Sequence, residues 1–159
     1  MSDTTSQVDV HAQPEPLHAR LLRHILLGLL AFSIAGTATE LLLLEHFESF
    51  TQWIPLAAFG IALPVTAAAA FLPRRSTIRL LQGVMVGFIA AGLAGLYFHY
   101  RGNVEFALET YPAMKGTELV WEALTGATPA LAPGTMVQIG LLGLAATFRH
   151  PALRHGNIR

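Results

Sequence analysis

The sequence contains no cysteine in its 159 residues. This absence excludes disulfide bonds, thiolate metal sites and cysteine nucleophiles. Charge is also scarce, because Asp, Glu, Lys and Arg together make up 13% of the chain, against roughly 25% in ordinary soluble domains. The ten acidic and ten basic residues cancel, so no net field attracts nucleic acid, and we expect no nucleic-acid partner.

Apolar residues are correspondingly frequent. They make up 53% of the chain, and the mean hydropathy is +0.50. A helix crosses the roughly 30 Å hydrocarbon core of a bilayer with about 20 apolar residues. The apolar segments that meet or approach this length are residues 25–44, 53–72, 80–100 and 133–148. The sequence therefore predicts an all-α integral membrane protein, a four-helix bundle that crosses the bilayer four times.

The basic residues predict how this bundle is oriented. Eight of the ten basic residues precede the first span, lie between the second and third spans, or follow the fourth: Arg20, Arg23, Arg74, Arg75, Arg79, Arg149, Arg154 and Arg159. Lys and Arg accumulate in cytoplasmic loops. We therefore expect a multi-pass protein of the cell (inner) membrane with both ends of the chain in the cytoplasm. Residues 1–20 and 153–159 are predicted to be cytoplasmic tails, the first of them disordered, and residues 21–152 the membrane domain.

The segment 101–132 is predicted to be a helical loop on the outer face. Asn103 can cap a short helix over residues 104–110, and Thr117 can cap a second one through Leu124. Pro112 and Gly116 separate the two. We expect the second helix to lie on the outer membrane surface or to fold over the end of the bundle.

Small residues predict how the third span packs. Gly83, Gly87, Ala91 and Gly95 follow one another at four-residue spacing, which places them on one face of a helix. Membrane helices associate by close backbone approach at small residues, because lipid is as apolar as leucine. This face is therefore predicted to contact a neighbouring helix.

Glu40 is the ionisable residue that stands out within the predicted spans. An acid inside the bilayer costs on the order of 3 kcal/mol on insertion scales. Glu40 shares a helical side with Ser33, Gly36 and Thr37, so it should point into the bundle. It is either a proton or cation site or a hydrogen-bonding residue between helices.

Imidazole and carboxylate groups collect near the predicted outer ends of the spans. Such groups suit zinc and other divalent metals, although their spacing matches no fixed metal motif. The candidate ligands are Glu45, His46, His99, Glu105 and Glu109. No cofactor is predicted, and a divalent metal at these residues is the alternative; otherwise they form a solvated acidic rim.

These observations rank three functions. The first is a small membrane protein without its own catalysis, an accessory or structural subunit. Its partners would be the lipid bilayer and other membrane subunits or further copies of the chain. The second is a transporter-like protein that handles protons or cations with Glu40 and the outer rim. The third is a membrane metal or redox protein that uses His46 and His99.

Overall fold

A computed structural model describes residues 16–45, 47–126 and 128–153. Its elements are α1 (Leu17–Leu43), α2 (Phe50–Phe71), α3 (Arg75–Thr110), α4 (Gly116–Thr125), α5 (Gly134–Thr147) and the short 3₁₀ helix η1 (Pro151–Leu153). The described residues contain no strand, so the all-α prediction is confirmed. Most of the two predicted tails lies outside the described residues, although α1 already begins four residues inside the first one.

Three helices are long and apolar enough to cross a membrane. They are α1 with 27 residues, α2 with 22 and α3 with 36. The fourth predicted span forms α5, which has only 14 residues. Such a helix is about 21 Å long, shorter than the roughly 30 Å hydrocarbon core. Three membrane-length helices are therefore observed, whereas a four-span bundle is not established.

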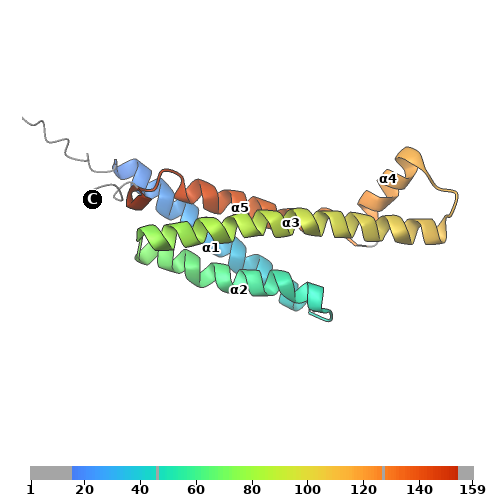
Figure 1. The fold of residues 1–159 in the computed structure, drawn as a ribbon, viewed down its shortest axis with the longest axis horizontal. Helices are drawn as coiled ribbons and strands as arrows, with labels where there is room; N and C mark the ends of the chain where they lie inside the picture. The colour runs from blue at the N-terminus through green and yellow to red at the C-terminus, as the bar shows by residue number, and fades with distance from the viewer. Residues whose placement is uncertain (1–15, 46, 127, 154–159) are drawn as a thin grey trace, which may run out of the picture.

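The four apolar helices contact one another in a ring. Helix α1 packs against α2 and α5, and α3 also packs against α2 and α5 (Figure 1). Large buried side chains fill the space between them, and Phe59 of α2 meets Phe88 of α3 edge to face at 5.1 Å. Leu30 and Ile34 of α1 and Met85 of α3 belong to the same core. The ring fixes which faces of α1 and α5 lie next to each other.

Of the predicted glycines on α3, Gly95 alone lies close to another segment, since an added Cβ atom there would lie 2.7 Å from the Pro133 Cβ atom. A Cβ atom added at Gly83 or Gly87 would have no neighbour within 4 Å, and both residues are exposed. A Cβ atom at Gly92 would lie 2.9 Å from the Pro133 carbonyl oxygen, and one at Gly140 would lie 2.7 Å from the Met85 carbonyl oxygen. The predicted face of α3 was thus wrong at Gly83 and Gly87, because α5 approaches α3 on the side of Gly92.

The prediction of two short helices in the segment 101–132 agrees with the structure in part. Helix α4 forms where the second short helix was expected, but Thr117 does not cap it, because the N-cap residue is Lys115 and makes no side-chain cap. The first short helix does not exist separately, since α3 runs unbroken through residues 104–110. Of the helices in the described part, α4 contacts α3 alone. Figure 1 shows α4 beside the far end of α3, well beyond α1, α2 and α5, so it does not fold over them.

Candidate functional site

A polar groove lies between α1 and α5. Its volume is about 390 Å³, and its lining residues are Phe32, Ser33, Gly36, Thr37 and Glu40 from α1 and Thr135, Gln138, Ile139 and Leu142 from α5. Five of these nine side chains carry oxygen, in a part of the molecule that is otherwise apolar. We call this feature the α1–α5 groove.

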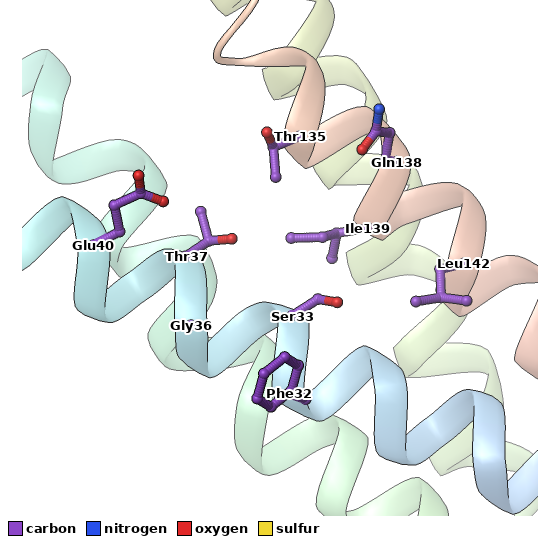
Figure 2. A pocket seen from close by; sticks show the side chains of 9 residues that line it. All are labelled: Phe32, Ser33, Gly36, Thr37, Glu40, Thr135, Gln138, Ile139 and Leu142. Carbon is purple, nitrogen blue, oxygen red and sulfur yellow. The ribbon is translucent and has the colours of Figure 1, made fainter.

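Helical spacing brings the polar groups of α1 into the groove. Ser33, Thr37 and Glu40 follow one another at intervals of four and three residues, so they share one helix face. Figure 2 shows the hydroxyl oxygens of Ser33 and Thr37 directed to the side of α5. The Glu40 carboxylate extends into the open space that Thr135 borders from the other helix. The sequence prediction that these residues share one side of the helix is therefore met, but that side opens onto a groove.

Glu40 has no protein partner in the described part of the chain. It is exposed, and its carboxylate forms no hydrogen bond or ion pair with any described residue. The side-chain amide of Gln138, also exposed, makes no such bond there either. The groove thus offers a carboxylate and an amide that the fold itself does not use.

The depth of the groove follows from helix geometry. Glu40 lies about 17 residues beyond Arg23, which corresponds to about 25 Å of helix. If Arg23 marks one edge of a hydrocarbon core about 30 Å thick, the Glu40 backbone lies near the opposite edge but still within the core. A membrane bounded in this way would place the Glu40 carboxylate close to the polar boundary of the hydrocarbon core.

The backbone amides at the start of α5 are hydrogen-bonded within their own segment. The amide nitrogens of Gly134, Thr135 and Met136 donate to the carbonyl oxygens three residues earlier, at 2.9, 3.1 and 3.0 Å. These turns use the amide groups that the start of a helix otherwise leaves free. The polar groups that the groove offers are consequently side chains, not the helix terminus.

The predicted metal ligands that the structure describes do not form a cluster. No group of three or more His, Asp or Glu residues close enough to hold a metal occurs in the part of the chain that the structure describes. His99 donates from Nδ1 to the Pro129 carbonyl oxygen at 3.3 Å, and Glu105 accepts from Arg101 Nε at 2.8 Å. Glu45 and Glu109 are exposed, and His46 lies outside the described residues. His99 and Glu105 are thus each bound to another residue of the protein, Pro129 and Arg101 respectively.

Asn103 is a structural residue that sequence reasoning misplaced. It was predicted to cap a helix, but it lies within α3 and is 4% exposed. Its Nδ2 donates to the carbonyl oxygens of Ala123 at 2.9 Å and Thr128 at 2.7 Å, and its Oδ1 accepts from the backbone and hydroxyl of Thr128. One side chain therefore holds both α4 and the segment after it. The residues near these bonds in the sequence are apolar or small: Ala123, Gly126, Pro129 and Ala130. None of them indicates that Asn103 binds this segment.

Comparison of the chain with protein-family models, with curated proteins and with solved structures gives no match.

Proposed function

We propose that this chain is an accessory subunit of a membrane assembly, without catalysis of its own, and that the α1–α5 groove receives a membrane helix of a partner protein. The observation that carries this proposal is the unpaired Glu40 carboxylate in a groove that also holds Ser33, Thr37, Thr135 and Gln138. Polar residues at membrane depth usually face protein or water instead of lipid. A partner helix along the groove would remove them from lipid.

The interactions available in the groove suit helix association. Hydroxyl and amide side chains that bond between membrane helices contribute about 0.6 kcal/mol each on average. Gly36 lies in the groove wall, and an added Cβ atom there would meet nothing within 4 Å. A second helix can therefore approach the α1 backbone closely at Gly36, which is how small residues act in membrane interfaces.

The orientation expected from sequence belongs to the same proposal. Figure 1 shows the beginnings of α1 and α3 and the end of α5 at one end of the molecule. The described basic residues at that end are Arg20, Arg23, Arg74, Arg75, Arg79 and Arg149. By the positive-inside tendency this end faces the cytoplasm. Four crossings with α5 as a short fourth span, and α4 on the outer side, follow from this placement.

A second candidate function is the handling of a proton or cation at Glu40. The grouping of its carboxylate with three hydroxyls and an amide around one groove favours this reading. Oxygen ligands of this kind suit hard cations. The two candidates differ in what must fill the groove: a partner helix in the first and a small ion in the second.

Photocrosslinking in native membranes tests the proposal. A photoreactive amino acid replaces Gly36 in the groove or, as a control, Gly60 on α2, which is also exposed and has no atom within 4 Å of an added Cβ. We expect a discrete adduct with another membrane protein from position 36 alone. Equal, diffuse labelling from both positions would contradict the proposal, because it would show that lipid covers the groove.

The second candidate is tested on purified protein. Titration with sodium, zinc, nickel and manganese between about pH 5 and 8 compares the parent with Glu40→Gln, which keeps the size of the side chain but removes the charge. Cation handling predicts saturable binding by the parent that the variant loses. No saturable binding by the parent would eliminate this candidate for the ions tested.

A further inference from the structure

The negative charge of Glu40 defines what the groove can accept. Charged residues within membrane segments usually pair with one another or with backbone groups. Glu40 has no such pair among the described residues. A cation is therefore required from outside the described part of the fold if the carboxylate is to stay ionised at this depth.

The apolar stretches of the chain contain no Lys or Arg that could supply that cation. These stretches are residues 25–44, 50–72, 80–100 and 134–148. The first basic residue beyond the third stretch is Arg101, and its Nε is already hydrogen-bonded to Glu105 at 2.8 Å. A second copy of the chain has the same composition, so its spans cannot offer a Lys or Arg at the level of Glu40 either.

We infer that the helix received by the α1–α5 groove carries a Lys or Arg at the level of Glu40 and pairs with it, a conclusion that rests on the proposed helix-binding function. The partner is a different protein from this chain. Ser33, Thr37 and Gln138 line the groove beside the pair and bond to the remaining polar groups. Burying a charge pair is favourable only when further hydrogen bonds surround it, and the groove provides them.

The experiment uses the full-length chain in phosphatidylcholine vesicles and synthetic membrane-spanning Leu/Ala helices as probes. The first peptide has one Lys about three residues from the end of its apolar stretch, matching the depth of Glu40. In the second peptide Leu replaces that Lys, and in the third the Lys is moved seven residues toward the centre. Energy transfer between a labelled peptide and a labelled chain reports association.

We expect the first peptide to bind the parent about tenfold more tightly than the other two, a ratio that corresponds to about 1.4 kcal/mol. Glu40→Gln should abolish this difference. Glu45→Gln, which removes a charge at the end of α1 outside the groove, should preserve it. A charge exchange completes the test: Glu40→Lys should prefer a peptide with Glu at the matched position.

Each other outcome contradicts the inference in a recognisable way. Equal binding of all three peptides to parent and Glu40→Gln would overturn the charge pair but leave the groove as a helix-binding surface. Self-association of the chain through the groove, detected by the same energy transfer between two labelled copies, would overturn the assignment to a different protein. Failure of every peptide to bind would overturn the inference, and only the crosslinking result at Gly36 would then decide on the proposed function.

Discussion

Asn103 joins separate segments through one side chain. Its amide and carbonyl groups are occupied by Ala123 and Thr128, so a buried polar residue is fully satisfied. A buried side chain with this many bonds specifies one arrangement of the segments that it contacts. The Asn103 amide therefore links α3 to α4 and to the segment after α4.

Asn103→Ala is expected to release α4 from α3. The substitution removes the donor to the Ala123 and Thr128 carbonyl oxygens, and each carbonyl left buried costs about 1–3 kcal/mol. Backbone amides of α4 should then exchange with deuterium about 30- to 700-fold faster, as a local opening made about 2–4 kcal/mol easier implies. Hydrogen–deuterium exchange with mass spectrometry measures this change.

Thr125→Ala provides the control for Asn103→Ala. It removes a hydroxyl that is bonded only to the Trp121 carbonyl within α4 itself, so exchange should change little. Equally fast exchange in the parent and in Asn103→Ala would show that α4 is held by its apolar contacts instead.

Individual residues differ in how well the sequence predicts them. The placement of Glu40 on one side of α1 with Ser33 and Thr37 follows from helical spacing alone, because 3.6 residues per turn fixes the angle between them. The contacts of Asn103 and His99 were not predictable in this way. Their partners lie 20 to 30 positions later in the chain, and no local pattern encodes such a distance.

At the scale of elements, the contact between α3 and α5 depends on glycine. Gly92 on α3 and Gly140 on α5 leave no room for a Cβ atom next to the opposite backbone. Gly143 lies against the Met85 side chain in the same interface. The short helix α5 thus keeps its place through close approach over its whole length.

Gly140→Ala is expected to destabilise the protein by about 1–3 kcal/mol, the usual cost of overpacking a filled interface. Its Cβ atom would lie 2.7 Å from the Met85 carbonyl oxygen and from Ile89 Cγ1, so the helices must move apart. Unfolding in mixed micelles with increasing dodecyl sulfate measures the change in free energy.

Gly87→Ala is the matched control for Gly140→Ala. It is also a glycine-to-alanine change within a helix, but no atom lies within 4 Å of the added group. We expect no loss of stability and a gain of up to about 1 kcal/mol, because Ala is a better helix former than Gly. The close-approach argument fails if the two variants lose the same stability.

The helices themselves were more predictable than their contacts. Apolar runs of 20 residues identify α1, α2 and α3, since length and composition decide whether a helix can cross a bilayer. Which face of α3 meets its neighbour could not be read from the same residues. Small residues lie on two sides of α3, Gly87 on one and Gly92 on the other, and only the position of α5 distinguishes them.

For the whole molecule, the fold places six of the eight described basic residues at one end and α4 at the other (Figure 1). The absence of cysteine makes this arrangement easy to examine, because an introduced cysteine is the only thiol in the chain. We expect Lys115→Cys to react with a membrane-impermeant maleimide on intact cells. Ser2→Cys and Arg159→Cys should react only after lysis.

Labelling of Arg159→Cys on intact cells would refute four crossings. It would mean that α5, with its 14 residues, does not return the chain across the bilayer. The three long helices would then account for every crossing. Reaction of Ser2→Cys from outside would instead reverse the proposed orientation of the whole molecule.

The uninterrupted length of α3 has a mechanical consequence. Between Gly95, which lies against Pro133 at the start of α5, and Thr110, at the end of α3, the backbone extends about 22 Å. Rigid helices of this kind can transmit displacement between distant parts of a protein. A force on α4 perpendicular to α3 would therefore tilt α3 about its contact with α5. The force would reach the α1–α5 groove, because α5 forms one of its walls.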